Sequence, residues 1–187
     1  PEAWGGNDGD LFMTIIAAQE LARCGAGGVL ASLLSHTIGC PPIINVGSDE
    51  IKRKVLPAVL RGEKISALAI TEPSGGSDVA NLKTTARRDG DHFVLSGSKT
   101  FITSGMRANF YTVAVRTGGP GAGGVSLLLV DKGTPGFTQT RLEKMGWLCS
   151  DTATLHFDDC RVPVANLVGA ENQGFKAIML NFNRERI

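Results

Sequence analysis

The apolar positions in the first third of the chain recur at the spacing of helices. Between Asp10 and Arg23 the spacing predicts a helix with one buried face, and Asp10 can cap its N-terminus. Residues 28–37 are almost wholly apolar, which predicts a buried helix. Ser48 can cap a third helix, in which we expect a break or kink at Pro57 because proline removes a helical hydrogen bond. This part of the chain is therefore expected to be helical.

From residue 66 the pattern changes to short β-type runs separated by Gly, Asp, Ser and Pro. No spacer between the runs is long enough for a helix, which favours an antiparallel barrel or sandwich over a parallel α/β sheet. After Asn172 the apolar positions return to helical spacing. The pattern thus predicts an α+β fold, with helices first, then a small β domain, then the start of another helix. The seven runs span residues 66–70, 92–96, 99–103, 110–116, 125–131, 136–140 and 153–158.

Composition narrows the class of protein. Lys and Arg number 19 against 18 Asp and Glu, a net charge of +1, and 42% of the residues are apolar. The apolar fraction excludes a disordered chain, and the balanced charge gives no electrostatic case for nucleic-acid binding. No apolar run approaches the roughly 20 residues that span a bilayer, and the N-terminus lacks the pattern of a secretory signal. Because the chain lacks an initial Met and a final helix cap, we expect both ends to be cuts.

The four cysteines are scattered along the chain. They form no CxxC pair and have no His at ligand spacing, so neither a zinc site nor a redox dithiol is indicated. Their even number is compatible with two disulfides, but scattered cysteines in a chain of this size are more typical of buried thiols in a reducing compartment. We expect packing residues, and no metal site, from Cys24, Cys40, Cys149 and Cys160.

Two glycine-rich segments differ in what they predict. Residues 119–124 satisfy GxGxxG, but a strand follows them where a dinucleotide fingerprint needs a helix N-terminus, so we expect a hairpin loop. The segment Thr71-Glu-Pro-Ser-Gly-Gly-Ser-Asp78 follows a strand, and its glycines permit a close backbone approach. Ser77 and the neighbouring N–H groups can hold a phosphate there. An ordinary polar turn is the alternative that spacing alone favours.

A third segment, Lys99-Thr-Phe-Ile-Thr-Ser-Gly105, places Phe101 and Thr103 on one face of a strand. An aromatic face beside a hydroxyl group suits a flat heteroaromatic ring. The same pair of side chains suits the edge of a core equally well.

Three motifs, in this order, resemble the acyl-CoA dehydrogenase family. They are Ala69-Ile-Thr-Glu-Pro-Ser-Gly-Gly-Ser-Asp-Val79, Gly97-Ser-Lys-Thr-Phe-Ile-Thr-Ser-Gly105, and the stretch from Ser150-Asp-Thr to Phe157-Asp-Asp-Cys-Arg-Val-Pro163. In that family a helical N-terminal domain precedes a small β-barrel domain and a C-terminal four-helix bundle, and FAD lies between the last two. The resemblance implies that the chain holds the end of the first domain (1–66), the middle β domain (67–171) and the start of the first bundle helix (172–187).

The resemblance also implies which residues contact FAD. Thr71 matches a hydrogen-bond partner of the flavin ring, and Thr103 matches the hydroxyl that bonds flavin N5, the atom that receives hydride. Phe101 stands where the family usually stacks a Trp on the ring, so it keeps an aromatic face but loses area and the indole N–H. The other implied contacts are Leu68 and Ile70 beside the ring, and Gly76 and Ser77 at the pyrophosphate.

For the acyl-CoA substrate, the resemblance implies contacts in three regions. Ser77 matches a contact of the pantetheine part, and Ser150 lies in a segment that contacts CoA. Asn183 and Arg186 match positions that bind pantetheine or the phosphate end of CoA.

The catalytic base has two possible locations. The family removes a substrate α-proton with a Glu, which most members carry in the C-terminal bundle outside this sequence. A minority, including the long-chain and isovaleryl types, place it immediately before the CoA-binding Arg, where this chain has Glu185. Burial in an apolar acyl pocket would raise the pKa of such a carboxyl towards the range useful for a base. The alternative for Glu185 is a surface ion pair with neighbouring Arg side chains.

The implied activity is FAD-dependent α,β-dehydrogenation of an acyl-CoA thioester to trans-2-enoyl-CoA, with electrons passed to an electron-transferring flavoprotein. The alternatives are an acyl-CoA oxidase on the same scaffold and a fragment without FAD or activity. Family members are usually homotetramers assembled through the bundle, which implies a homotetramer at full length. The expected location is the cytoplasm of a bacterium, or the mitochondrial matrix of a eukaryote.

Overall fold

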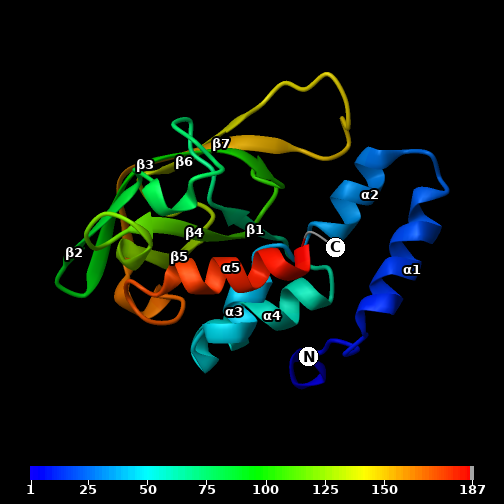
Figure 1. Cartoon of the computed structure of the whole chain (residues 1–187), viewed down its shortest axis with the longest axis horizontal. Coiled ribbons are helices and arrows are strands. Elements are labelled where there is room, and N and C mark those ends of the chain that lie inside the picture. The colour runs from blue at the N-terminus through cyan, green and yellow to red at the C-terminus, as the bar shows by residue number, and fades with distance from the viewer. Residues whose placement is uncertain (186–187) are drawn as a thin grey trace.

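The computed structural model describes residues 1–185, and for 183–185 the helical backbone alone. Figure 1 shows the elements in chain order from blue to red. The helices are α1 (Leu11–Ala22), α2 (Gly27–Leu34), α3 (Cys40–Val46), α4 (Asp49–Leu60) and α5 (Gly174–Glu185), and the short 3-10 helices are η1 (Glu2–Trp4), η2 (Val79–Asn81), η3 (Ala122–Gly124) and η4 (Val164–Asn166). The strands are β1 (Ser66–Ala69), β2 (Thr85–Asp89), β3 (His92–Thr103), β4 (Phe110–Arg116), β5 (Val125–Asp131), β6 (Phe137–Arg141) and β7 (Thr152–Pro163).

The strands form one curled, mixed sheet. Its order is β1-β4-β2-β3-β7-β6, and β5 pairs with β4. Most pairings are antiparallel, but β1 runs parallel to β4, and β2 meets the end of β4 in a parallel pairing of Thr85 with Arg116. The α+β class is confirmed. The purely antiparallel arrangement that the short spacers favoured is not, because the chain leaves β1 through a long loop and returns to the sheet at β2 and β4.

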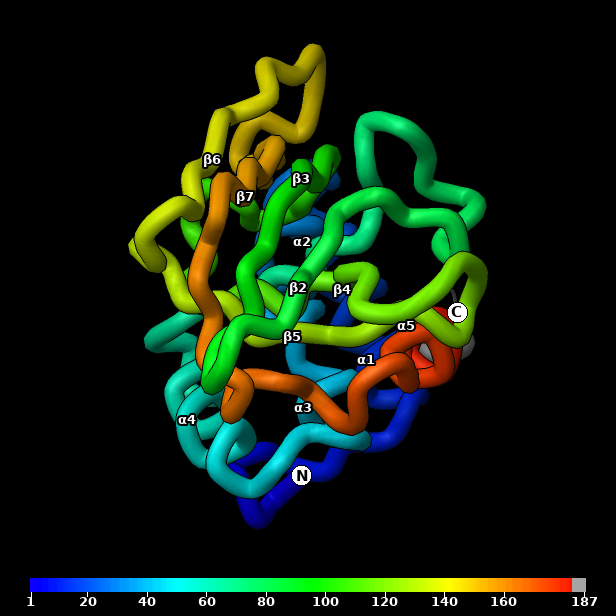
Figure 2. The backbone as a smooth tube through the Cα atoms, turned by 90° about the vertical axis from the view of Figure 1, so that its left-hand side faces the viewer, coloured from blue at the N-terminus to red at the C-terminus, as the bar shows by residue number. Residues whose placement is uncertain are grey.

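Two apolar cores hold the fold together. One lies inside the curl of the sheet, where Phe137 stacks on Phe157 with ring centroids 5.0 Å apart and meets the edge of Tyr111. The other lies between β4, β5 and the three helices α3, α4 and α5. Figure 2 shows α3 and α4 below the strands with α5 beside them. The sheet is therefore covered on this face. The clefts of the candidate site begin at the uncovered end of the sheet, beside β1 and the end of β3.

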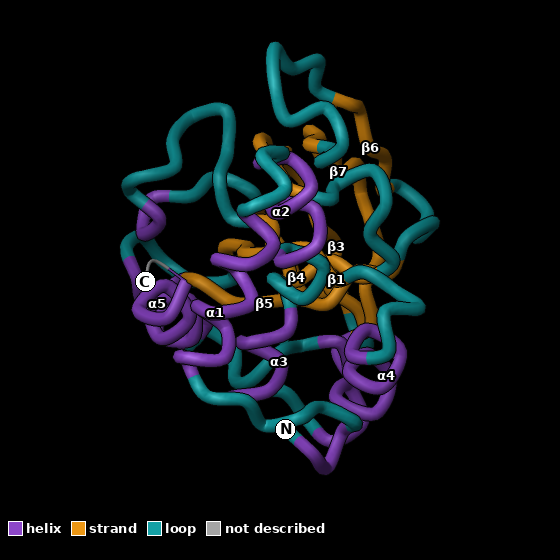
Figure 3. The backbone as a smooth tube through the Cα atoms, turned by 90° about the vertical axis from the view of Figure 1, so that its right-hand side faces the viewer, coloured by secondary structure: helices purple, strands orange, loops and turns teal. Residues whose placement is uncertain are grey.

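The first two helices differ from the prediction. Asp10 does cap α1, since its side chain accepts a hydrogen bond from the backbone N–H of Met13 at 2.9 Å. However, no residue of α1 is buried, and in α2 only Gly28 is. Phe12 is 73% exposed and Leu33 is 50% exposed. The apolar residues of these helices line an open cleft rather than a core, because both helices stand beside the sheet rather than on it (Figures 1 and 3).

Two further helical features differ from the sequence pattern. Helix α4 begins at the predicted cap, Ser48, but continues through Pro57 to Leu60 without the expected break. Pro57 has no N–H to donate to the carbonyl of Arg53 four residues earlier, and Arg53 is an exposed residue. Helix α3 was not predicted. Its prolines fall in the first turn, where their missing N–H groups cost nothing.

Strand β2 is not among the seven predicted runs, and these runs differ from the structure at two further points beyond a residue at their ends. The runs 92–96 and 99–103 join into the single strand β3, which carries irregular pairing on both sides of Lys99. Strand β7 is longer than predicted and extends to Pro163. The GxGxxG segment 119–124 forms the connection of the β4–β5 hairpin, as expected. Strand β5, and not an α-helix, follows this segment, unlike the glycine-rich turn of a dinucleotide-binding fingerprint.

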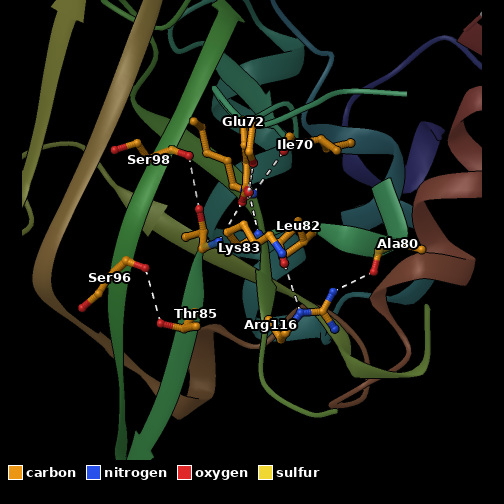
Figure 4. Close-up of polar contacts among 12 residues, drawn as sticks. Ile70, Glu72, Ala80, Leu82, Lys83, Thr85, Ser96, Ser98 and Arg116 are labelled. Carbon is orange, nitrogen blue, oxygen red and sulfur yellow. Dashed lines mark hydrogen bonds and ion pairs between the residues drawn. The ribbon is translucent and has the colours of Figure 1, made fainter. Parts of the chain in front are cut away.

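Arg116 ties this hairpin connection to the loop that follows Thr71. Its guanidinium donates hydrogen bonds to the carbonyls of Leu82 (3.0 Å) and Ala80 (2.7 Å), as Figure 4 shows. It donates two more, to the carbonyls of Gly119 and Gly121. One planar cation thus satisfies four carbonyls from two loops that have little regular structure of their own.

The cysteines and the hydropathy of the helices complete the fold. Cys40 and Cys160 are buried as expected, but Cys24 and Cys149 are exposed, so the packing interpretation is wrong for these two; all four are free thiols. In the part of the chain that the structure describes, none of the helices combines the length and the apolar character needed to cross a bilayer.

We predict that Arg116→Lys lowers the free energy of unfolding by about 1–3 kcal/mol, because an ammonium group cannot reach all four carbonyls. Urea unfolding followed by circular dichroism measures the change. Arg141→Lys, at an exposed position in β6, is the matched control and should stay within about 0.5 kcal/mol of the wild type. Equal stability of the Arg116→Lys variant would contradict this role.

Candidate functional site

The open end of the sheet carries a cleft of about 180 Å³. It brings together five of the residues predicted to contact a flavin. Leu68, Ile70 and Thr71 come from β1 and the residues after it, and Phe101 and Thr103 come from the end of β3. The cleft is completed by Ile38, Ile102 and Phe182.

An irregular pairing in β3 aims Phe101 at this cleft. The register between β3 and β7 shifts between Lys99 and Ile102, and Phe101 occupies the shift with a φ of 57°. A bulky residue in the left-handed region is strained, and such strain gathers at functional sites. Phe101 is 69% exposed, although its neighbours in the strand are buried. The irregularity therefore turns an aromatic ring out of the sheet and into the cleft.

The loop after Thr71 forms a second cleft, of about 290 Å³, with helix α5. Residues 76–80 line one side, and Phe175, Met179 and Phe182 of α5 line the other. Phe182 lines both clefts, so the two adjoin. A Cβ atom on Gly76 would lie 2.9 Å from Cγ2 of Thr71, which explains why glycine is needed for the loop backbone to pass so close to Thr71.

A third and larger cleft, of about 740 Å³, is mostly apolar and runs between α1 and α2. Thr103 and Ile38 line this cleft as well as the first one, so Thr103 lies where the two meet. Its far wall includes Trp147, in the long loop between β6 and β7. This loop packs on α2 so tightly that a Cβ atom on Gly28 would lie 2.8 Å from Sγ of Cys149.

The predicted CoA contacts are placed less completely. Ser77 lines the second cleft, whereas Ser150 is buried. The backbone N–H of Ser150 donates a hydrogen bond to the carbonyl of Trp147 at 2.9 Å. The side chains of Asn183 and Glu185 and the whole of Arg186 lie outside the described residues, although the backbone of α5 reaches Glu185.

A buried ion pair that was not predicted from the sequence joins Lys99 to Glu72, which Figure 4 labels. Nζ of Lys99 lies 2.8 Å from Oε1 of Glu72, and the two side chains are 0% and 3% exposed. Lys99 also donates to the carbonyl of Ile70 at 3.1 Å. The carboxylate of Glu72 accepts the backbone N–H groups of Lys83 and Thr84 at 2.5 and 2.8 Å. Each charge is therefore compensated by the other and by hydrogen bonds to the backbone.

The pKa values follow from this arrangement. Burial alone would raise the pKa of Glu72, but the charge and hydrogen bond of Lys99, with the N–H groups of Lys83 and Thr84, lower it to about 2. Burial lowers the pKa of Lys99 to about 8, against the opposing effect of Glu72. Both groups are charged at neutral pH. A signal was present in the sequence, since Lys99 occupies an inward-facing position of a predicted strand and has to find a partner.

A second missed residue, Asp151, fixes the turn that follows Thr103. It is 5% exposed and accepts the N–H of Met106 at 2.7 Å and the side chain of Arg107 at 2.5 Å, while its carbonyl accepts the N–H of Ser104. Burial alone would raise the pKa of Asp151, but the hydrogen bonds and charge of Arg107 and the N–H of Met106 lower it. In the sequence, the Ser-Asp-Thr motif pointed only to Ser150, and the role of Asp151 was not predicted.

The residues of the adjoining clefts fit FAD. Apolar side chains with two threonine hydroxyls suit a flavin ring. The loop whose backbone Gly76 brings close to Thr71 suits a pyrophosphate, which is bound by backbone N–H groups and small side chains. Leu68, Ile70, Thr71, Phe101 and Thr103 would hold the ring. Gly76 and Ser77 would hold the phosphates.

Comparison with known proteins agrees with this fit. Residues 1–63 match the acyl-CoA dehydrogenase N-terminal domain, and residues 67–160 match the acyl-CoA dehydrogenase middle domain. The acyl-CoA dehydrogenase apdG of Emericella nidulans is 47% identical over 182 residues, which are 95% of this chain and 42% of that protein.

Solved structures give the same result. The acyl-CoA dehydrogenase of Geobacillus kaustophilus superposes with a TM-score of 0.92 and 42% identity, and butyryl-CoA dehydrogenase of Megasphaera elsdenii with 0.92 and 36%. Both matches cover 100% of this chain and 50% of theirs, so the chain spans about half their length. The fold is the one that these two acyl-CoA dehydrogenase structures have over half of their length. The chain belongs to the acyl-CoA dehydrogenase family.

Glu72 makes the stability of the fold depend on acid pH. Its pKa of about 2 in the folded state lies below the value of about 4.3 for an unfolded chain. The folded state therefore gains stability from the ionised carboxylate above about pH 4.3 and loses this gain as the pH falls towards 2. We predict that Glu72→Gln is destabilised by about 3–5 kcal/mol at pH 7, and that this deficit shrinks between about pH 4.3 and pH 2.

Urea unfolding at a series of pH values measures the deficit. Glu143→Gln, at an exposed position, is the control and should stay within about 0.5 kcal/mol of the wild type. A deficit that is the same at pH 7 and pH 2.5 would show that the charge of Glu72 is not its source.

Proposed function

We propose that the protein at its full natural length is an FAD-dependent dehydrogenase, which converts an acyl-CoA thioester to trans-2-enoyl-CoA and passes the electrons to an electron-transferring flavoprotein. One observation carries the proposal. Thr103 lies at the junction of the first cleft, which collects the residues predicted to contact the flavin ring, and the large apolar cleft. A flavin in the first and an acyl chain in the second would therefore meet at Thr103. Family membership supports both the cofactor and the substrate class.

FAD supplies a hydride acceptor when it is bound. The protein's part is to hold the ring and the thioester in contact and to remove the α-proton. Thr71 and Thr103 offer hydroxyl groups to the ring and Phe101 offers an aromatic face, while apolar walls exclude water. Loss of the α-proton to a carboxylate and of the β-hydrogen as hydride leaves a carbon–carbon double bond next to the thioester. We propose Glu185 as that carboxylate.

The apolar cleft supports a hydrocarbon acyl chain as the group bound beside Thr103. Among its lining residues are Leu11, Ile15 and Leu34 of α1 and α2, which were expected to be buried in a core. We propose that Ser77, Asn183 and Arg186 contact the CoA part. Ser150 is 3% exposed, so its contribution would come through the loop that it anchors. We also propose that the full-length protein is a homotetramer.

Anaerobic titration with straight and branched acyl-CoA thioesters tests the function. The visible absorbance of the oxidised flavin should fall on addition of a substrate, and purified electron-transferring flavoprotein should restore it. Fast reoxidation of the reduced flavin by air alone would favour an acyl-CoA oxidase. A protein that binds no FAD would refute the proposal.

Gly76 provides a test of where FAD is bound. We predict that Gly76→Ala weakens FAD binding by about tenfold or more, because the new Cβ would collide with Thr71 on one side of the cleft. Gly119→Ala adds the same methyl group in open space and is the matched control. The dissociation constant is measured by titrating apoprotein with FAD. Equal affinity of the two variants would contradict the placement.

Glu185 provides a test of the chemistry. Glu185→Gln is expected to lower the turnover of acyl-CoA by about 100-fold or more while FAD binding is kept, because the amide cannot accept the α-proton. Glu143→Gln, far along the chain at an exposed position, is the control and should turn over normally. Retained turnover in Glu185→Gln would place the base elsewhere.

A further inference from the structure

The pair of Glu72 and Lys99 differs from the other ion pairs of the described residues. In each of the others at least one partner is more than a third exposed, whereas here both side chains are buried. A buried pair is a poor source of stability, because removing two charges from water costs about as much as their attraction returns. Its presence therefore calls for an explanation other than stability.

The hydrogen bonds of the pair end on the three segments that line the two flavin clefts. Lys99 lies two residues before Phe101 in β3 and donates to the carbonyl of Ile70, so it joins β3 to the residues after β1. The backbone N–H of Thr100 donates to the carbonyl of Thr71 at 2.8 Å and strengthens the same junction.

Glu72 holds the third segment. Its carboxylate accepts the N–H groups of Lys83 and Thr84, which close the far end of the loop that carries Gly76 and Ser77. At the near end, the backbones of Glu72 and Gly75 exchange two hydrogen bonds. The loop thus leaves the sheet at Glu72 and returns to the same carboxylate 11 residues later.

We propose that Glu72 and Lys99 are positioning residues, which fix the ring-binding segments and the phosphate-binding loop relative to one another before the cofactor arrives. The inference rests on the proposed FAD site and deepens it. Neither side chain lines the flavin clefts, so both act through the residues that do. Without the pair, three segments would have to be ordered by FAD itself, at the expense of its affinity.

The direct test is Lys99→Met in the protein at its full natural length. Methionine keeps the apolar length of the side chain but removes the bonds to Glu72 and Ile70. We expect the dissociation constant of FAD to rise by about tenfold or more. Val162→Ala is the matched control. Val162 is a buried residue of β7 that lies opposite Phe93, at the end of β3 away from Phe101. Its truncation removes core packing there, so this variant should bind FAD as the wild type does.

The comparison of the two variants separates positioning from general stability. Urea unfolding is measured alongside FAD titration. If Lys99→Met binds FAD within about twofold of the wild type, the proposal is overturned. If Val162→Ala loses as much affinity as Lys99→Met at equal loss of stability, the effect is one of stability and the proposal is also overturned.

A measurement on the wild type covers the case in which Lys99→Met does not fold. Hydrogen exchange of the amides of Lys83, Thr84 and Thr100 is compared with and without FAD. These amides bond to the network and lie outside the two flavin clefts. We expect their exchange to be slow already without FAD, and fast exchange that FAD slows by about tenfold or more would overturn the proposal. Wild-type protein that binds no FAD would instead refute the proposed function.

Discussion

The structure depends on the requirement that a carboxylate taken out of water be surrounded by donors. Glu72 is placed in the interior by the strand before it, and within the described residues its carboxylate is reached by an ammonium, two backbone N–H groups and the hydroxyl of Ser74. None of these groups belongs to β1, the strand that precedes Glu72. Satisfying one charge therefore determines where the segments around the cleft lie.

The irregular parts of the site are organised by polar contacts rather than by apolar packing. Arg116 donates to carbonyls in two loops, Asp151 accepts N–H groups in the turn after Thr103, and Glu72 accepts N–H groups at the end of the loop that carries Gly76 and Ser77. Loops bury little apolar surface, so directional bonds to a few charged side chains are the available means of holding them still. The cores of the sheet and helices then supply the rigid frame to which these charges are attached.

Most of the elements could be predicted from the sequence because their burial is local. Strands β4 and β5 match their predicted bounds, since both are mostly apolar and are flanked by turn residues. Five residues of the first cleft were predicted too, Phe101 and Thr103 from their shared face of a strand as well as by resemblance, and Leu68, Ile70 and Thr71 by resemblance. The exposure of α1 and α2 could not be predicted, because apolar residues such as Leu11 and Leu34 look the same in a sequence whether they line a cleft or a core.

Partnerships over long distances in the sequence were the other gap. Glu72 and Lys99 are 27 residues apart, and Asp151 and Arg107 are 44 apart. Each residue alone is an ordinary surface type, and the pairing exists only once β1, β3 and the loop before β7 have been brought together. The parallel pairing of β1 with β4 has the same origin, since it depends on where a long loop returns and not on any local pattern.

The absence of a side chain at residue 28 has a consequence for the shape of the apolar cleft. Helix α2 and the loop of Trp147 and Cys149 touch through the bare backbone of Gly28, with no room for even a methyl group. Both contribute to the lining of the cleft, α2 through Ala31 and Leu34 and the loop through Trp147. Any side chain at residue 28 would push these two parts of the lining apart, so the shape of the cleft depends on a position that does not itself line it.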